Sequence, residues 1–360
     1  MGRTVELRPD PGTSADPGRP ADGPLLEVSG LDVTYRTRRG AVPAVRGVSF
    51  HVERGEVFGL VGESGSGKSS LVTALMRLLP RGTTMRADRL EFAGQDLSSM
   101  SEAGLRALRG RTIGLVPQRP MTSLSPVTPV AAQLRRLTGG EVDDERLHEL
   151  LTDVGLGGLR QRLGDYPFQF SGGQLQRMLI AVAVLAREPQ LVLADEPTTT
   201  LDATVQAQVL RLLLDLRERL GNTVLLVTHD LSVVAQVCDR VGVMYGGRLV
   251  EVATTRELFE NPQHPYTRAL LRAMPSNRAP GERLMPIPGS VSGAQLLPGC
   301  PFAPRCDRAT DLCHRVDPEP LEVVAESSLS PTTPLAAPLA VPLKTPQVRT
   351  VRCHHPGSPA

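Results

Sequence analysis

The strongest constraint on the fold is the glycine-rich stretch Gly62 to Ser69, with the sequence Gly-Glu-Ser-Gly-Ser-Gly-Lys-Ser. It follows an apolar run, Val57 to Val61, and opens an apolar periodic segment, Leu71 to Leu79, so we expect a strand, a loop and a helix. The pattern G-x-x-x-x-G-K-[ST] is typical of a loop whose backbone N–H groups surround phosphate oxygens at a helix N-terminus. The sequence therefore predicts an α/β fold that binds a nucleotide.

Two side chains of this loop have distinct expected roles. Lys68 is expected to reach the β- and γ-phosphates, and the hydroxyl of Ser69 is placed to ligate Mg²⁺. The residues expected to bind nucleotide here are Gly62, Glu63, Ser64, Gly65, Ser66, Gly67, Lys68, Ser69 and Ser70.

Length and charge limit the other classes of function. The 360 residues are enough for about two domains. The formal net charge of +2, without a long block of like charge, does not indicate a nucleic-acid-binding surface. The apolar run Met178 to Ala186 is far short of the roughly 20 residues that cross a bilayer, and the N-terminus has no apolar core of signal-peptide length. We expect a cytosolic protein that does not itself span a membrane.

The chain divides into segments of different pattern. Residues 1–24 are rich in Pro, Gly, Asp and Arg and are expected to form a disordered tail. Strand-like runs at 25–35 and 45–52 precede the one that leads into the glycine loop, so a small β region comes first. Residues 119–169 change to helical spacing and predict a helical insertion inside the α/β domain.

Polar side chains follow two further buried strands. Leu191 to Ala194 is followed by Asp195 and Glu196, and Thr223 to Val227 leads to His229. The carboxyl ends of strands are where α/β sheets place their ligands. Asp195 suits Mg²⁺, Glu196 suits the general base that orients the attacking water, and we favour a γ-phosphate contact for His229.

A second glycine-containing helix start comprises Ser171, Gly172, Gly173 and Gln174. Ser171 and Gln174 have the spacing of a capping box, which is a structural explanation. Two consecutive glycines, however, are unfavourable for packing, because they have no side chains. Their accessible backbone N–H groups can instead be directed at an anion. We infer that this helix start serves a site completed by another subunit.

The order of these motifs resembles an ATP-binding cassette (ABC) ATPase over roughly residues 25 to 275. The resemblance implies a P-loop NTPase with a RecA-like core, an antiparallel β subdomain and a helical subdomain. It also implies catalytic roles for Lys68, Gln118, Glu196 and His229, and Mg²⁺ contacts from Ser69, Gln118 and Asp195.

The remaining correspondences are the Walker A loop at Gly62 to Ser69, the signature motif at Ser171 to Gln174, the D-loop at Asp202 and the adenine-stacking residue at Tyr35. From the residues alone, Tyr35 either stacks on adenine or covers the core as an edge-strand aromatic.

Phrases near the C-terminus resemble the peptide/nickel importer branch of that family, the dipeptide and oligopeptide permease ATPases. They are Asn-Pro-Gln-His-Pro-Tyr-Thr-Arg-Ala-Leu-Leu at 261–271 and Gly-Cys-Pro-Phe-Ala-Pro-Arg-Cys at 299–306. The resemblance implies an ABC domain over 25–260, a permease-type C-terminal domain over 261–360 and a location on the cytoplasmic face of the membrane. It further implies a second cassette, favoured as a paralogue, two permease subunits, a separate substrate-binding protein and uptake of peptides, with nickel or another metal chelate as an alternative substrate. A soluble ABC machine of DNA repair or ribosome work and a non-catalytic regulatory cassette are the rival classes.

Four of the five cysteines lie in this last region, at Cys300, Cys306, Cys313 and Cys353. In a cytosolic chain such clustering favours a metal over disulfides, and four thiolates serve Zn²⁺ or an iron–sulfur cluster, with free thiols as the third alternative. The family resemblance implies a [4Fe–4S] cluster. The Pro-rich stretch near 331–346 is expected to be an irregular inserted loop, and Cys238 a small core residue.

Overall fold

The computed structural model describes residues 23–38, 40–140, 142–199, 201–274, 286–323 and 349–357. The predicted N-terminal tail, apart from its last two residues, and the Pro-rich insertion lie outside these ranges. Within them, no helix combines the length and apolar character that a bilayer crossing requires.

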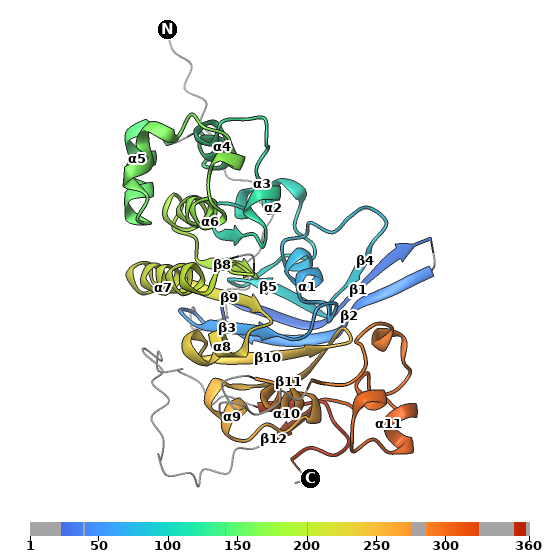
Figure 1. The fold of residues 1–360 in the computed structure, drawn as a ribbon. Coiled ribbons are helices and arrows are strands. Elements are labelled where there is room, and N and C mark those ends of the chain that lie inside the picture. The colour runs from blue at the N-terminus through green and yellow to red at the C-terminus, as the bar shows by residue number, and fades with distance from the viewer. Residues whose placement is uncertain are drawn as a thin grey trace.

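An eight-stranded sheet forms the centre of the molecule (Figure 1), and its strand order is β12-β13-β11-β10-β3-β9-β8-β7. Five neighbouring strands, from β10 to β7, are parallel. Their bounds are β3 Val57–Val61, β7 Ile113–Val116, β8 Leu191–Asp195, β9 Thr223–Thr228 and β10 Arg240–Tyr245. Because β3 and β9 are buried at every position, their sequences are continuous apolar runs, as expected for strands covered on both faces. The predicted α/β class is confirmed.

A second, antiparallel sheet covers one face of this core. Its strands are β1 Leu26–Thr37, β2 Gly40–Val52, β4 Thr84–Arg86, β5 Arg89–Phe92 and β6 Gln95–Asp96. The long hairpin β1–β2 packs its apolar residues with those of helix α1, Lys68–Leu75, and with alternate residues of β3, including Phe58 and Leu60. The predicted strands before the glycine loop are therefore present, and they form the β subdomain.

Helices cover the opposite face and form a separate block at the upper left of Figure 1. The block follows α2 Glu102–Leu108 and contains α3 Pro120–Ser123, α4 Val130–Leu137, α5 Asp144–Asp153 and α6 Gly172–Ile180, with 3-10 turns η1 Gly157–Arg162 and η2 Pro167–Gln169. In α5 the buried residues are Leu147, Leu150 and Leu151, so the helical insertion is confirmed. The two remaining helices of this face are α7 Ala203–Leu220 and α8 Leu231–Val237.

The structure corrects two expectations about the helices and confirms a third. Helix α1 ends at Leu75, short of Leu79, because the chain turns at Arg77 with φ +52°. The apolar helix expected to end near Arg187 is α6 continued by a π-helical segment, η3 Ala181–Leu185, so this expected end is confirmed. The sequence also predicts that Cys238 lies in an apolar helix, but it lies one residue beyond α8; its expected burial in the core is confirmed.

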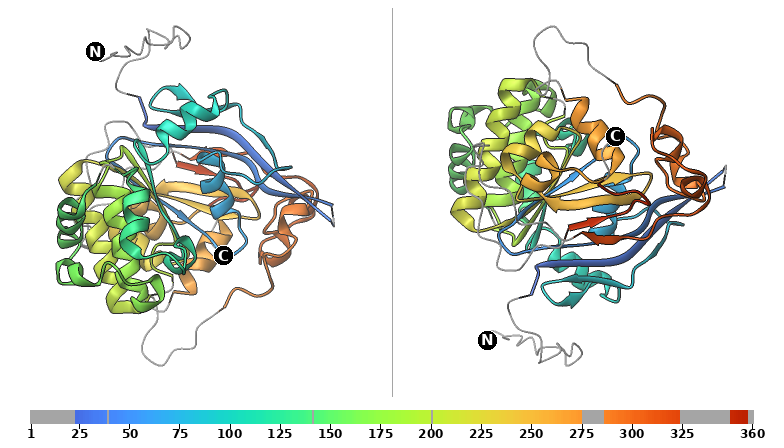
Figure 2. Two further views of the ribbon diagram at one scale, coloured as in Figure 1. Left: turned by 90° about the horizontal axis from the view of Figure 1, so that it is seen from above. Right: turned by 90° about the horizontal axis from the view of Figure 1, so that it is seen from below.

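The C-terminal region adds strands to the central sheet. Strand β11, Arg248–Thr254, pairs antiparallel with β10 and with β13, Arg349–Val351, which in turn pairs with β12, Leu321–Val323. The helical elements here are α9 Thr255–Glu260, α10 Pro265–Arg272, η5 Ala294–Leu296, η6 Ala303–Arg305 and α11 Asp311–Arg315. Figure 2 shows the red strands continuing the yellow ones in the view from below. Cys300, Phe302 and Cys313 belong to the same apolar core as the helix-covered face of the sheet, so this region shares both sheet and core with the nucleotide domain.

Candidate active site

The glycine loop joins β3 to α1, as predicted, and two of its glycines are required by close packing. A Cβ atom at Gly62 (φ +156°) would lie 2.1 Å from the carbonyl oxygen of Met244. A Cβ atom at Gly67 (φ +109°) would lie 2.2 Å from the carbonyl oxygen of Ala44. Neither position admits a side chain, so the loop is held between β10 and β2 with its backbone exposed toward the cleft.

Lys68 lies at the start of α1, with its side chain only 4% exposed. Its Nζ donates to the carbonyl oxygens of Gly62, at 2.8 Å, and Glu63, at 3.1 Å, and lies 3.7 Å from Oε1 of Glu196. Burial lowers the pKa of Lys68, whereas the carboxylates of Glu196 and Asp195 oppose that shift. The buried ammonium group of Lys68 thus lies between the carbonyl groups of the loop and the carboxylates of Asp195 and Glu196 at the end of β8.

Glu196 follows β8 in a left-handed conformation, with φ +44°, and its N–H donates to the carbonyl oxygen of Val227 at 2.9 Å. Such strain in a residue other than glycine costs about 1–3 kcal/mol and is concentrated at functional sites. The strained residue here is the one that the sequence predicts as general base.

Three side chains converge on one carboxylate oxygen, Oε2 of Glu196. The amide Nε2 of Gln118 donates to it at 2.8 Å, the hydroxyl of Thr199 donates at 2.9 Å, and Nδ1 of His229 lies at 3.4 Å. Gln118, Glu196 and His229 follow the neighbouring strands β7, β8 and β9, whose carboxyl ends meet at one edge of the sheet.

These neighbours keep Glu196 charged. Burial would raise its pKa, but the Thr199 hydrogen bond, the charges of Lys68 and His229 and the Gln118 hydrogen bond together hold it below its usual value. An ionised carboxylate at neutral pH can accept a hydrogen bond from water and polarise it for attack.

Ser69 and Asp195 provide oxygen ligands of the kind that Mg²⁺ binds. The Ser69 hydroxyl donates to Oδ1 of Asp195 at 3.2 Å, and burial raises the pKa of Asp195 against that hydrogen bond. A hydroxyl and a carboxylate adjacent to a phosphate-binding loop match the hard, oxygen-rich donor set of this ion. The residues present therefore fit Mg²⁺, which would supply charge neutralisation at the phosphates.

These groups border a cleft of about 750 Å³. Of the predicted residues, the cleft is lined by Gly62, Glu63, Ser64, Gly65, Gly67, Lys68, Ser69, Ser70, Gln118, Glu196 and His229. Ser66 is fully buried beneath the loop, and Asp195 lies behind Ser69.

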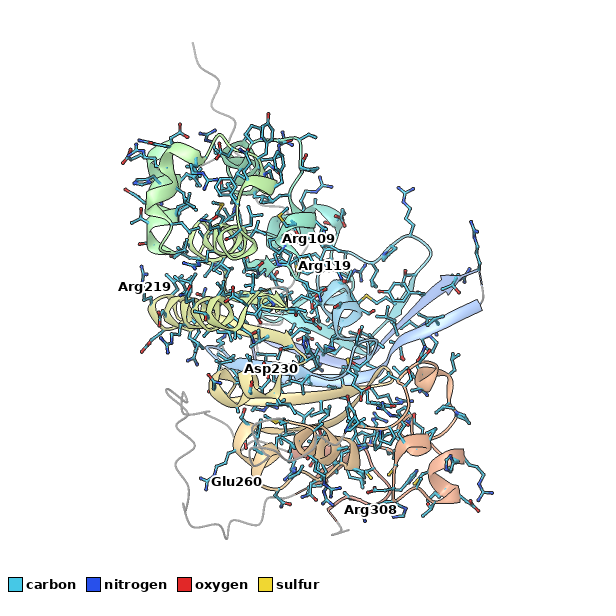
Figure 3. All side chains as sticks on the ribbon, viewed as in Figure 1. Arg109, Arg119, Arg219, Asp230, Glu260 and Arg308 are labelled. Atoms are coloured by element: carbon cyan, nitrogen blue, oxygen red, sulfur yellow. The ribbon has the colours of Figure 1, made fainter. Side chains whose placement is uncertain are left out.

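The cleft also contains residues that the sequence did not indicate: Val42, Pro43, Ala44, Arg119, Thr199, Gly247, Leu270 and Gln295. Arg119, labelled in Figure 3, lies close to α1. Arg119 follows Gln118 directly, and Thr199 stands three residues after Glu196, so both could have been found from their neighbours. Leu270 and Gln295 come from the C-terminal region, and no local pattern connects them with a nucleotide.

Two family models match the chain. One, described as ABC transporter, matches residues 45–199, and the other, described as oligopeptide/dipeptide transporter, C-terminal region, matches residues 250–313. A probable peptide ABC transporter ATP-binding protein of Sinorhizobium fredii is 44% identical over 304 residues, which cover 82% of this chain and 90% of that protein. The dipeptide transport ATP-binding protein of Bacillus subtilis is 42% identical over 302 residues, with the same coverage. The chain belongs to the ABC transporter family.

Other relatives extend this assignment. The oligopeptide transport ATP-binding protein of Mycobacterium tuberculosis is 44% identical over 312 residues, and the chain spans 51% of its length. Among solved structures, cbiO1 of Clostridium perfringens, part of an ABC transporter complex, matches 66% of this chain and 90% of its own, with a TM-score of 0.55 and 28% identity. The ATP-binding cassette MJ0796, in a dimeric post-hydrolysis state bound to ADP and Pi, matches 64% of this chain and 99% of its own, with a TM-score of 0.54 and 26% identity. The P-loop ABC cassette predicted from the sequence is confirmed, and the chain is an ATPase of this family.

The signature segment of this ABC ATPase does not line the cleft formed by its own phosphate loop. Ser171 is the N-cap of α6, and its capping box with Gln174 is formed as predicted, with N–H to side-chain distances of 2.9 and 3.2 Å. A Cβ atom at Gly173 would lie 2.5 Å from Cγ1 of Val205 on α7, whereas one at Gly172 would meet Leu201 at an ordinary 3.5 Å. Packing therefore explains Gly173 but not Gly172.

Asp202 and Tyr35 also lie outside the residues that line the cleft. Asp202 caps α7 by accepting from the N–H of Val205 at 3.0 Å. Tyr35 is half-buried against the core of the β subdomain, and its neighbour across the hairpin, Val42, does line the cleft. The structure thus gives Tyr35 the core contact of the structural interpretation and places it one strand from the cleft.

The four C-terminal cysteines lie around one small cavity, which His264, His354 and His355 also border. All are free thiols, and burial raises the pKa of Cys300 to about 12 and also raises the pKa values of Cys306 and Cys353. Across the part of the chain that the structure describes, no three His, Cys, Asp or Glu side chains are grouped closely enough to hold a metal ion. Burial thus disfavours the thiolate forms of Cys300, Cys306 and Cys353, which metal binding would require.

Proposed function

We propose that this chain is the ATP-hydrolysing subunit of an importer for dipeptides, oligopeptides or related small solutes. The observation that carries the proposal is the joining, in one fold, of two parts. One is a cleft in which Lys68, Gln118, Thr199 and His229 surround the Glu196 carboxylate, and the other is a C-terminal region that matches the oligopeptide/dipeptide transporter model. In this proposal Glu196 polarises the attacking water, and Lys68 with the loop N–H groups binds the phosphates. Ser69 and Asp195, with Gln118 beside them, hold Mg²⁺.

The position of the signature segment supports a dimer of cassettes. Ser171 and Gly172 are not buried and do not reach the chain's own cleft. The N–H of Ser171 donates to Gln174, whereas the N–H of Gly172, at the start of α6, is available to a nucleotide held by another cassette. Tyr35 and Asp202 lie outside the cleft lining as well, and in this proposal Tyr35 moves onto the adenine and Asp202 contacts the partner cassette. We take that partner to be a paralogue.

The remaining partners follow from the same proposal. Two permease subunits provide the membrane pathway, a separate binding protein delivers the substrate, and the chain works at the cytoplasmic face of the membrane. The names of the relatives, which include peptide, dipeptide and oligopeptide transport proteins, support peptides over metal chelates as the substrate.

Purification of the tagged full-length chain from its own host tests the proposal. Membranes are solubilised in mild detergent, and co-purifying proteins are identified by mass spectrometry. Two multi-span permeases with a second cassette are expected, and a captured binding protein would lead to the substrate. Recovery from the soluble fraction with ribosomal or DNA-repair proteins would leave the ATP chemistry intact and overturn import.

We further propose that the cysteine cavity holds a [4Fe–4S] cluster, with Zn²⁺ as the alternative. Support comes from the donor set, because Cys300, Cys306, Cys313 and Cys353 border one buried space and four thiolates serve either metal centre.

Purification without air provides the test of the cluster. The wild-type chain and a Cys238→Ala control, whose thiol lies outside this cavity, should both be brown and contain iron and acid-labile sulfide. Cys306→Ala should lose the colour. A colourless wild-type chain that contains zinc would favour the alternative, and a metal-free one would end the metal proposal.

A further inference from the structure

The C-terminal region contacts the phosphate loop directly, at Glu63. The backbone N–H of Glu63 donates to the hydroxyl of Tyr266 at 3.0 Å, and Oε2 of its carboxylate accepts from Nη1 of Arg305 at 3.0 Å. Tyr266 lies in α10 and Arg305 ends η6, so both contacts join residues more than 200 positions apart in the sequence. The loop is therefore held from outside the nucleotide domain's own motifs.

Arg305 is held firmly in place for this contact. Its Nε donates to the carbonyl oxygen of Pro288 at 2.6 Å, Nη2 donates to that of Ile287 at 3.1 Å, and Nη1 also donates to the hydroxyl of Tyr245 at 3.1 Å. The side chain is 6% exposed, compared with 28% for that of Glu63. A charge pair with one partner so well anchored and shielded is stronger than an exposed surface pair.

Tyr266 is equally constrained. It is completely buried, and its ring packs against those of Tyr245 and Phe302, with centroids 4.5 and 5.3 Å away. Burial raises the pKa of Tyr266, so its hydroxyl stays neutral and can accept the N–H of Glu63. The backbone of the loop is thus attached to a side chain that has little freedom to move.

A purely mechanical interpretation would be that Glu63 only fastens the C-terminal region to the cassette. The other contacts of Glu63 argue against this, because its carbonyl oxygen accepts from Nζ of Lys68 at 3.1 Å and the residue itself lines the cleft. Three atoms of Glu63 are therefore engaged: the N–H by Tyr266, Oε2 of the carboxylate by Arg305 and the carbonyl oxygen by Lys68. A shift of Glu63 would necessarily change the surroundings of the phosphate-binding lysine.

We propose that Arg305 and Tyr266 are positioning residues that clamp Glu63 and thereby set the affinity of the phosphate loop for nucleotide. Arg305 directly precedes Cys306, so the clamp also connects the cysteine cavity with the cleft. Changes in the C-terminal region would then alter nucleotide binding without any change in the catalytic groups at Glu196. The inference rests on nucleotide binding by this ABC ATPase and not on peptide import.

The test is the affinity of the purified full-length chain for MgADP, measured by titration calorimetry. ADP occupies the phosphate loop without turnover, partner cassette or permease, so failure here is distinguishable from failure of the import proposal. We expect Arg305→Gln and Glu63→Gln each to weaken binding by about tenfold, the order of magnitude for a hydrogen bond between charged groups. The double variant should be no weaker than the weaker single variant, and Arg305→Lys should restore part of the affinity.

Two further variants keep the test decisive if Arg305→Gln disturbs folding. Tyr266→Phe removes only the hydroxyl that accepts the Glu63 N–H and should weaken MgADP binding severalfold with an unchanged circular dichroism spectrum. Arg315→Gln changes an exposed arginine of α11 in the same region and should bind like the wild type. Additive effects of the Arg305 and Glu63 changes, or wild-type affinity in folded Arg305→Gln and Tyr266→Phe, would overturn the proposal.

Discussion

The nucleotide cleft and the C-terminal region use charge in opposite ways. In the cleft, Lys68 and Glu196 are 3.7 Å apart, His229 is 54% exposed, and Oε2 of Glu196 has several competing neighbours. In the C-terminal region, the carboxylate of Glu251 is completely buried and lies 2.6 Å from Arg349, whose side chain is 4% exposed. The cleft charges can exchange partners, whereas the buried charges of Glu251 and Arg349 are paired with each other in the folded protein.

The comparison separates function from stability. Charged groups that share several partners can be redirected to phosphate and water as the reaction proceeds, at the cost of local strain such as that of Glu196. Buried pairs add little net stability, but they are strongly destabilising when one member is removed. Substitutions in the two regions should therefore damage different measurable properties.

The largest expected effect is that of Glu196→Gln. The amide cannot act as a base, so turnover of ATP should fall by a factor of about 100 or more, while MgATP binding and the thermal unfolding temperature stay near those of the wild type. Phosphate release at saturating MgATP measures the first quantity, and nucleotide titration measures the second.

A matched control for this change is Glu260→Gln. Glu260 ends α9, lies in the lower part of Figure 3 away from the labelled Arg119, and pairs with Arg256 on the surface. Its turnover should equal that of the wild type. Residual hydrolysis at the wild-type rate in Glu196→Gln would refute the assignment of the base.

The second effect concerns the pairing of β13 with β11 in the central sheet. Arg349→Ala should destabilise the protein by about 3–5 kcal/mol, because Glu251 would keep its buried charge without a cation. Of its partners among the described residues, Glu251 would retain the N–H groups of Gln263 and His264, at 2.8 and 2.9 Å. Urea unfolding followed by circular dichroism measures the change, while MgATP binding at low temperature should persist.

A paired variant distinguishes the charge from the packing. Arg349→Met combined with Glu251→Gln removes both charges and keeps most of the volume, so it should be less destabilised than Arg349→Ala alone. If the double variant is the less stable of the two, loss of packing and not an unpaired charge is the cause.

The cleft was predictable because its parts are short and local. The loop at Gly62 to Ser69 and the polar residues Asp195, Glu196 and His229 each follow a strand that is visible as an apolar run. Parallel strands then bring these ends to one edge of the sheet without further information. Tyr35 shows the limit, because whether an edge-strand aromatic faces the core or the cleft depends on packing that one strand does not encode.

The C-terminal region was less predictable because its contacts join distant segments. Strands β12 and β13 have only three residues each, too few for a periodic pattern, and they are defined by pairing with β11. The contact between Arg305 and Glu63 likewise has no local signal. Cysteine spacing indicated that the thiols gather, but not what they bind.

The smallest expected effect is a dependence of stability on pH that originates at His264. This residue is buried, and its Nδ1 accepts from the N–H of Tyr266 at 3.0 Å, which caps α10. Burial lowers the pKa of His264 from 6.5 to about 3. Between these two values the unfolded chain binds more protons than the folded chain, so the stabilisation is complete above pH 6.5 and is lost as the pH falls.

The size of the His264 contribution follows from the shift. Acidification below pH 6.5 should remove about 1.4 kcal/mol of stability per pH unit until the folded histidine itself protonates. His264→Asn keeps an oxygen that can cap α10 but does not titrate. The midpoint of urea unfolding should therefore fall more steeply between pH 6 and pH 5 in the wild type than in this variant. Parallel slopes would show that other groups, and not His264, govern the acid sensitivity of the C-terminal region.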